Sequence, residues 1–250
     1  MRLYDHQISA VEYLRSRNRA LLTDEMGLGK TISALSALQE GNGALVICPA
    51  SLKMNWSAEA TRWTKFKVTV LNGKNSFRLP KPGEIVIMNY AILPNRKDFD
   101  AHDNYKKGPD LYGNNPHITV IVDEAHYLKN WKSARTRKWR FLSKEIVEGG
   151  GRIWLMTGTP LITSPSDLWG VLSSAQLERD AYGNWHNFLR QWGGIDGAFG
   201  LEWDADLIKD TAGRGFTRVA FGRKREEVLS SLPSKQYSVI NVKTSVSQLL

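Results

Sequence analysis

The chain has 250 residues with one Cys and nine Trp, and its 34 Lys and Arg face only 25 Asp and Glu. This length and an apolar share of 42% suffice for one packed domain, with or without an appendage, and exclude a disordered chain. Cys48 alone cannot form an internal disulfide, no secretory leader pattern opens the sequence, and no apolar run approaches the roughly 20 residues of a membrane-spanning helix. We therefore expect an intracellular protein with no membrane association, and the positive charge favours a polyanionic partner.

Helical and strand-like patterns alternate along most of the chain, which is typical of an α/β fold with a parallel sheet flanked by helices. In chain order, apolar spacing predicts helix 3–15, strand 20–23, helix 30–38, strand 44–48, helix 51–63, strands 68–71 and 85–88, a polar loop over 93–116, and strands 118–122 and 152–156. The uniformly apolar runs 44–48 and 118–122 are expected to be covered on both faces. After Pro165 we expect a small helical insertion over 164–225 and a returning strand at 237–242.

Positive charge is concentrated between Lys129 and Arg152, where eight Lys and Arg accompany two Glu. Trp131, Trp139 and Phe141 are interleaved with these cations. Two interpretations remain open: a solvated helix face anchored by its aromatic residues, or a surface for a polyanion.

The segment Asp24-Glu-Met-Gly-Leu-Gly-Lys-Thr31 lies between a predicted strand and a predicted helix. Its glycines let backbone N–H groups turn toward phosphate oxygens, Lys30 adds a cation, and Thr31 adds a hydroxyl for Mg²⁺. The generic phosphate-loop pattern has another Gly where this chain has Asp24. A solvated strand-to-helix turn is the alternative, but the context favours a phosphate loop.

Acidic and hydroxyl residues follow two further predicted strands. Asp123-Glu-Ala-His126 comes directly after strand 118–122, and a carboxylate there is costly to bury unless a cation meets it. Phosphate-bound Mg²⁺ near Lys30 would meet Asp123, and Glu124 could then polarise an attacking water. Thr157-Gly-Thr-Pro160 follows strand 152–156 and, taken alone, is an ordinary turn.

Four segments of this chain resemble, in order, motifs I, Ia, II and III of superfamily 2 helicases, and specifically of the Snf2-like ATPases. They are residues 24–31, 48–56, 123–126 and 157–160. Motif Ia is matched by Cys48-Pro-Ala-Ser-Leu52 with Asn55-Trp56, and Asp24 itself fits the family. Compact inserts are most similar to the annealing-helicase-like branch. The resemblance covers nearly the whole chain and implies a RecA-like P-loop lobe over 1–163, a helical insertion over 164–225, and a return strand with the start of a linker over 226–250.

The resemblance also implies roles for single residues. Catalysis would use Lys30, Asp123 and Glu124, with Mg²⁺ held by Thr31 and Asp123. ATP would contact Gln7, Glu25, Met26, Gly27, Leu28, Gly29, Lys30, Thr31 and Ile32. Coupling between the sites would use His126, Thr157 and Thr159. The DNA backbone would face Ser51, Leu52, Lys53, Asn89 and Tyr90, and contact without base reading suits a motor that steps over any sequence.

Snf2-like motors have two RecA-like lobes, and the second lobe supplies arginine fingers. Only 15 residues follow Lys235, so we expect the second lobe to be missing from this chain. Arginine fingers contribute about 10³ to 10⁵ in rate, and the chain alone is therefore expected to hydrolyse ATP very slowly.

The leading hypothesis is thus the N-terminal lobe of an ATP-driven translocase on double-stranded DNA. The alternatives are a strand-separating superfamily 2 helicase lobe, a non-catalytic DNA- or protein-binding module, and a P-loop kinase or transferase, which would leave Asp123–His126 and Thr157–Pro160 unexplained. Such a protein, whether encoded by a prokaryote or by a virus of a prokaryotic host, is expected in the cytoplasm, and in a eukaryote it is expected in the nucleus.

Overall fold

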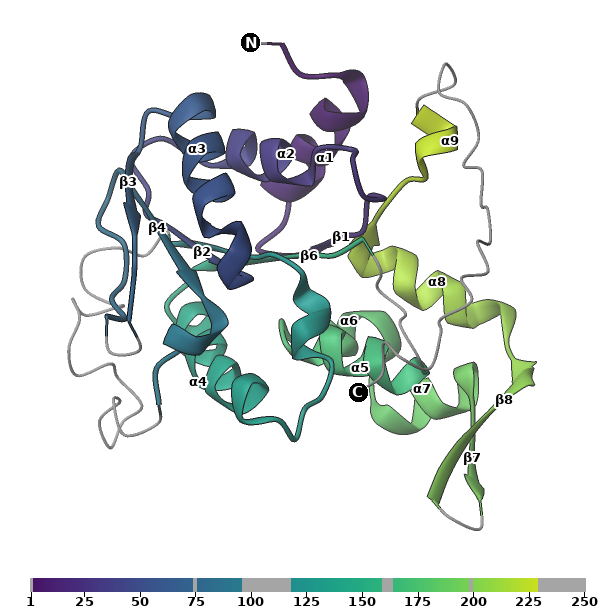
Figure 1. Cartoon of the computed structure of the whole chain (residues 1–250). Coiled ribbons are helices and arrows are strands. Elements are labelled where there is room, and N and C mark those ends of the chain that lie inside the picture. Colours follow the sequence, from purple (N-terminus) through teal and green to yellow (C-terminus); the bar gives the residue numbers. More distant parts are fainter. Residues whose placement is uncertain (1, 74–75, 96–117, 159–163, 198–199, 229–250) are drawn as a thin grey trace, which may run out of the picture.

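Seven parallel strands form the sheet at the centre of the chain, in the order β3-β4-β2-β5-β6-β1-β9 (Figure 1). The computed structural model describes residues 2–73, 76–95, 118–158, 164–197 and 200–228. The strands are β1 Arg19–Leu22, β2 Ala44–Cys48, β3 Lys67–Val70, β4 Glu84–Asn89, β5 Thr119–Val122, β6 Arg152–Met156 and β9 Ala220–Phe221. The predicted α/β fold with a parallel sheet is confirmed, and six of these strands match predicted ones to within one or two residues.

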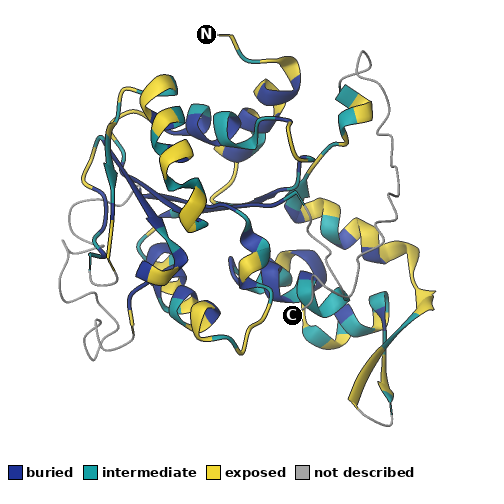
Figure 2. Ribbon diagram, viewed as in Figure 1, coloured by how far each residue is buried: buried dark blue, intermediate teal, exposed yellow. Residues whose placement is uncertain are grey.

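Helices cover both faces of the sheet, which lies between them as a dark, buried layer in Figure 2. One face carries α1 Asp5–Arg15, α2 Lys30–Ala37 and α3 Lys53–Trp63. The other carries α4 Ala134–Glu148, α5 Pro165–Ser173, α6 Glu178–Tyr182 and α7 Trp185–Trp192. None of the described helices is long and apolar enough to cross a membrane.

Alternation along the central strands builds two hydrophobic cores. In β2, Leu45 and Ile47 pack with α4 and its neighbours, whereas Val46 packs with the helices on the opposite face. All five residues of β2 are fully buried. A buried parallel strand therefore reads as a continuous apolar run, because both of its faces need apolar side chains.

The segment expected to be a helical insertion is more varied than predicted. It contains α5, α6, α7 and α8 Asp210–Val219, but also an antiparallel hairpin of β7 Gly193–Gly197 and β8 Gly200–Ile208. Gly193 and Gly200 have φ of +72° and +117°, so glycines start this hairpin and lie at its turn, and Trp203 packs against the aromatic rings of α7.

The chain returns to the sheet directly after α8, where β9 pairs with β1, and α9 Arg225–Val228 follows. The strand predicted at 237–242 lies outside the described residues.

The basic segment between Lys129 and Arg152 contributes both to the core and to the charge of the surface. Trp139 of α4 is fully buried and its indole donates a 2.7 Å hydrogen bond to the Ser174 carbonyl, whereas Trp131 is 57% exposed. Lys129 forms a 3.0 Å ion pair with Asp167. Most of the remaining Lys and Arg lie on the outer face of α4, so this helix is anchored to the core by its aromatic side and solvated on its basic side.

Candidate functional site

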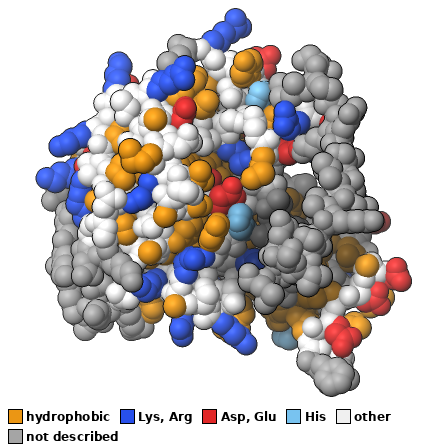
Figure 3. All heavy atoms as spheres, in the orientation of Figure 1, with side chains coloured by type: hydrophobic (Ala, Val, Ile, Leu, Met, Phe, Trp, Pro, Cys, Tyr) orange, Lys and Arg blue, Asp and Glu red, His pale blue; other side chains and the backbone are white. Residues whose placement is uncertain are grey.

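The predicted site residues follow the carboxyl ends of neighbouring parallel strands. In register, Leu22 of β1 lies beside Met156 of β6, and Val122 of β5 lies beside Ile47 of β2. The loops after these four strands therefore open at one edge of the sheet, which is where ligands bind in open α/β folds. Figure 3 shows acidic and His side chains next to one another near the middle of the face at this edge, with Lys and Arg along its margin.

The glycine loop, residues 24–31, connects β1 to α2. Gly27 and Gly29 have φ of +90° and +81°, and Gly29 is the N-cap of α2. A side chain at Gly29 would collide with the amide of Gln7. Both positions thus favour glycine for backbone conformation, and a side chain at Gly29 would also displace the Gln7 amide. The first amides of α2 lack partners within the helix and point out of its N-terminus, which suits an anion.

The Lys30 ammonium is held inside the glycine loop. It donates a 2.6 Å hydrogen bond to the Asp24 carbonyl and a 3.4 Å bond to the Glu25 carbonyl. Burial lowers the pKa of Lys30, an effect that the carboxylates of Glu124, Asp24, Asp123 and Glu25 oppose. The loop cation and the acidic turn, residues 123–126, are therefore in electrostatic contact although about a hundred residues separate them in sequence.

Gly158 lies next to the Lys30 ammonium, because a Cβ at that position would be 3.6 Å from Lys30 Nζ. The end of β6 thus reaches the same point as the glycine loop. The predicted residue Thr159 lies outside the described residues.

Asp123 is buried, and each of its oxygens accepts one hydrogen bond. The indole of Trp56 donates to Oδ2 at 2.8 Å, and the Glu124 amide donates to Oδ1 at 3.0 Å. Burial raises the pKa of the Asp123 carboxyl, while these hydrogen bonds and the nearby Lys30 and His126 work in the opposite direction. Each carboxylate oxygen retains acceptor capacity for a further ligand.

Glu124, His126 and Thr157 form a short polar row. Glu124 has φ of +50°, a left-handed conformation that is uncommon outside glycine. Its Oε2 lies 3.1 Å from His126 Nδ1, and the same ring nitrogen lies 3.3 Å from Thr157 Oγ1. The structure thus brings the predicted coupling residues His126 and Thr157 together beside the acidic turn.

The predicted metal ligands suit Mg²⁺ in donor chemistry, since Mg²⁺ prefers hard oxygen ligands and keeps several waters. Thr31 stands in the first turn of α2, and its hydroxyl has no hydrogen bond to any described residue. Asp123 is a buried carboxylate that has no ion pair within 4 Å among the described residues, although Lys30 is close enough to affect its pKa.

Tyr90 is placed differently from its predicted role at the DNA backbone. It is only 6% exposed, and its hydroxyl donates to the carbonyls of Asp123 at 2.6 Å and Glu124 at 3.3 Å. Burial raises the pKa of Tyr90 well above its usual value. Its ring stacks on Tyr127, and the Arg135 guanidinium lies over both rings. The side chain supports the acidic turn from within the protein, while Asn89 before it is half-buried.

The other predicted DNA-facing residues lie where β2 leads into α3. Ser51 is exposed and Leu52 half-buried, in the short 3₁₀ helix Ala50–Leu52. The Lys53 ammonium donates to the Leu71 carbonyl at 2.9 Å and to Asn72 Oδ1 at 2.7 Å. Its charge is thus partly satisfied by the protein itself.

Gln7, which is predicted to contact ATP, lies against the glycine loop. Its Nε2 donates a 3.5 Å bond to the Leu28 carbonyl, which His6 Nε2 approaches at 3.1 Å, and its Oε1 accepts from the Tyr4 amide. Among the remaining predicted loop residues, Met26 is 62% exposed and Leu28 is buried. Ile32 is half-buried in the first turn of α2.

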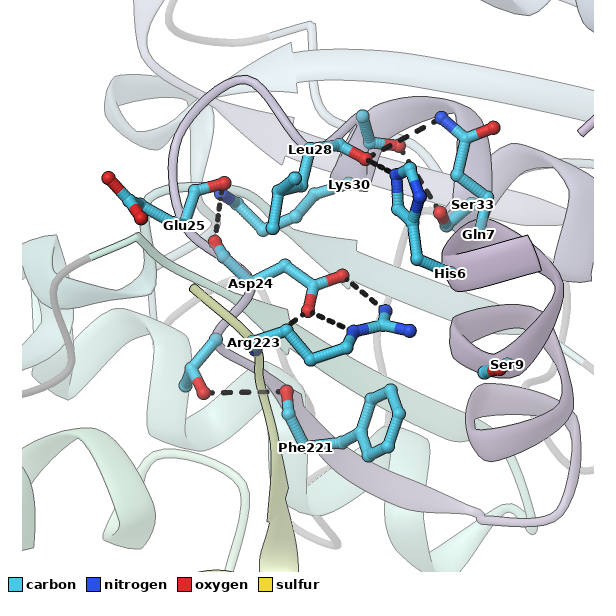
Figure 4. A network of polar contacts seen from close by, with 12 residues as sticks. His6, Gln7, Ser9, Asp24, Glu25, Leu28, Lys30, Ser33, Phe221 and Arg223 are labelled. Carbon is cyan, nitrogen blue, oxygen red and sulfur yellow. Dashed lines mark hydrogen bonds and ion pairs between the residues drawn. The ribbon is translucent and has the colours of Figure 1, made fainter. Parts of the chain in front are cut away.

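Sequence reasoning missed the partner of Asp24. This fully buried carboxylate accepts three bonds from Arg223, namely from its amide and Nε at 3.0 Å each and from Nη2 at 2.7 Å (Figure 4). The available signal was an Asp in place of a loop glycine, since a buried acid needs a cation. It also missed the hydrogen bond from Trp56 to Asp123, because it used Trp56 only as part of motif Ia.

The chain is similar in sequence to known proteins. The family model described as SNF2-related domain matches residues 6–249. A Caenorhabditis elegans homolog of SWI/SNF-related matrix-associated actin-dependent regulator of chromatin subfamily A-like protein 1 is 29% identical, with 96% of this chain and 34% of that protein covered. Human DNA annealing helicase and endonuclease ZRANB3 is 28% identical, with 89% and 20% covered.

In fold, the chain is similar to the Sulfolobus solfataricus SWI2/SNF2 ATPase core in complex with dsDNA, with a TM-score of 0.64 at 20% identity, covering 93% of this chain and 47% of that one. The chain spans 34% and 20% of the lengths of the two curated relatives named above. Because the family model covers nearly its whole length, the chain belongs to the SNF2-related domain family.

Proposed function

We propose that the chain is the ATP-binding lobe of a Snf2-type ATPase that translocates on double-stranded DNA. The observation that carries this proposal is that the glycine loop with Lys30 and the acidic turn with Asp123 and Glu124 follow parallel strands of one sheet and open at the same edge. A cation, a helix N-terminus and a carboxylate pair are the groups that Mg-ATP binding and phosphoanhydride hydrolysis require.

In this proposal, Lys30 exchanges the Asp24 carbonyl for phosphate oxygens, and the first amides of α2 bind the same phosphates. Thr31 and Asp123 hold Mg²⁺, which neutralises charge on the phosphate oxygens when bound. Glu124 orients the attacking water, and His126 links Glu124 to Thr157. Gln7 faces the base of the nucleotide.

Two observations support DNA as the partner: the names of similar proteins and the position of an exposed segment of this chain. The structural neighbour is an ATPase core in complex with dsDNA, and one relative is named a DNA annealing helicase. In this chain, exposed Ser51 and the start of α3 lie at the same edge as the glycine loop. A second lobe outside these 250 residues would supply the arginine fingers, so we expect the lobe alone to turn over slowly. Its place would be with DNA, in the nucleus of a eukaryote or the cytoplasm of a prokaryote.

Binding of Mg-ATP to the chain, measured by calorimetry, tests the first half of this proposal. Lys30→Ala should abolish measurable binding, whereas Lys65→Ala should retain it because Lys65 is exposed and lies after α3, away from the glycine loop. Binding that survives Lys30→Ala would contradict the assignment.

ATPase assays on the protein with its downstream lobe test the second half. Stimulation by duplex DNA supports a duplex translocase. Preferential stimulation by single strands would instead indicate a strand-separating helicase, and binding without any turnover would indicate a non-catalytic module.

A further inference from the structure

A ladder of hydrogen bonds continues past β9 and along the glycine loop. The Thr23 amide donates to the Phe221 carbonyl at 2.7 Å, the Glu25 amide donates to the Arg223 carbonyl at 3.0 Å, and the Arg225 amide donates to Glu25 Oε2 at 2.8 Å. The loop therefore pairs with residues 221–225 almost as one strand pairs with another.

Close approach makes this pairing specific. A Cβ at Gly222 would come within 2.9 Å of the Thr23 carbonyl group, so any larger residue there would push the two segments apart. The Phe221 ring stacks on Tyr13 of α1, with ring centroids 5.0 Å apart, and the Arg223 guanidinium lies 4.5 Å from the Phe221 centroid. Arg223 is thus held over a fixed aromatic surface.

The Asp24–Arg223 ion pair lies at the centre of this ladder, as Figure 4 shows. Asp24 is fully buried and has no other cation within 4 Å among the described residues, so its charge is compensated by Arg223. The Asp24 carbonyl meanwhile accepts from Lys30 Nζ. One residue of the loop thereby contacts both the proposed phosphate-binding cation and the segment that leads to α9.

We propose that Arg223 is a positioning residue that ties residues 220–228 to the glycine loop through Asp24, so that the loop and this segment change conformation together. The proposal rests on the proposed function in that the loop is taken to bind nucleotide phosphates. Nucleotide binding, which draws Lys30 away from the Asp24 carbonyl, then alters the segment after α8, and by linkage the position of that segment alters nucleotide affinity.

Amide hydrogen exchange on the nucleotide-free chain is the first test. Arg223→Gln should speed exchange of residues 24–30 by about tenfold or more, with β2 unchanged, because the loop opens locally and not with the whole sheet. Lys224→Gln is the matched control, since Lys224 is exposed and its side chain has no bond to a described residue. Loop exchange equal in the two variants would overturn the proposal.

Arg223→Gln leaves Asp24 buried without its cation and can fail to fold, so Asp24→Gly is the second variant. It removes the carboxylate and restores the glycine of the generic loop pattern. Residues 220–225 should then lose protection although none of them has been changed. Unaltered protection of that segment would overturn the proposal.

A double-mutant cycle on Mg-ATP affinity shows whether Arg223 acts through Asp24. Arg223→Gln should weaken binding by about fivefold or more in the parent chain and by less than about twofold in the Asp24→Gly background. Equal losses in both backgrounds would exclude coupling through Asp24. Should the parent chain bind no Mg-ATP, the proposed function fails, while the exchange experiments still decide the role of Arg223.

Discussion

The indole of Trp56 donates a hydrogen bond of 2.8 Å to Asp123 Oδ2, so α3 directly holds the carboxylate that follows β5. Trp56 stands one helical turn after Lys53, at the start of α3 and next to the turn proposed to face DNA. A rigid turn of helix therefore separates the proposed DNA contact from the proposed metal ligand. Any shift of α3 changes the surroundings of Asp123.

Trp56→Phe should move the acid limb of Mg-ATP binding to higher pH. Burial raises the pKa of Asp123, and the hydrogen bond from Trp56 is the largest effect opposing it. Losing that bond raises the pKa further, so protonation of Asp123 weakens metal binding at a pH where the parent still binds. Affinity measured from pH 8 downward checks this.

Trp154→Phe is the control for lost packing, since Trp154 is also fully buried but its indole donates to the Arg17 carbonyl. Identical pH profiles for Trp56→Phe and the parent would show that the indole does not tune Asp123.

Tyr90→Phe should slow ATP hydrolysis while changing nucleotide affinity little. The lost hydroxyl donates to the carbonyls of Asp123 and Glu124, and Glu124 is held in a left-handed conformation that its neighbours must support. The free energy of unfolding should fall by about 1 kcal/mol, the net value of one hydrogen bond. Turnover and affinity are measured in the protein that carries its downstream lobe.

Tyr182→Phe is the matched control, because it also removes one buried hydrogen bond. The Tyr182 hydroxyl donates to the Ala212 carbonyl at 2.9 Å, within the insertion. If both variants lowered turnover equally, the effect would come from general destabilisation and not from the acidic turn.

Glu124→Gln should keep Mg-ATP binding and lose hydrolysis. The amide preserves the size of the side chain, but it carries no negative charge and cannot accept a proton from water. Single-turnover assays in the two-lobe protein separate bound from cleaved nucleotide. Glu59→Gln on α3 is a control carboxylate away from the acidic turn, and hydrolysis undiminished by Glu124→Gln would remove Glu124 from its proposed role.

Most of the sheet could be predicted because buried parallel strands are marked by local composition. The bounds of β2 and β6 were predicted to the residue, since every side chain in them except Arg152 packs in one of the two cores. The glycine loop and the acidic turn were located by residue type and order. That they meet followed from topology, because both come after parallel strands of one sheet.

Ion pairs and hydrogen bonds between residues far apart in the sequence could not be predicted. The Asp24–Arg223 pair spans 199 positions and the Trp56–Asp123 bond spans 67, and no local pattern encodes either. The motif placed Tyr90 in the turn expected to face DNA. Whether its side chain is exposed depends on how η2 Tyr90–Ile92 packs over the acidic turn, and here the side chain is buried. The hairpin β7–β8 was missed because its glycines indicate turns and its strands are mostly exposed.

Glu84→Gln should lower the thermal stability of the chain near neutral pH but not near pH 2. Glu84 is 5% exposed in β4 and accepts from Arg78 at 2.6 and 2.7 Å and from Thr69 at 2.7 Å. The Arg78 guanidinium is the main cause that lowers the pKa of Glu84 from 4.5 to about 2. A carboxyl with a lowered pKa stabilises the fold above its unfolded pKa, and this contribution is lost as pH falls from about 4.5 to about 2. Melting temperatures of the Glu84→Gln variant and the parent should therefore converge over that interval.

Glu40→Gln is the control, because Glu40 is exposed after α2, and its melting temperature should follow that of the parent at every pH. If the difference in melting temperature between Glu84→Gln and the parent stayed constant with pH, the ionised carboxylate of Glu84 would not be what stabilises this part of the sheet.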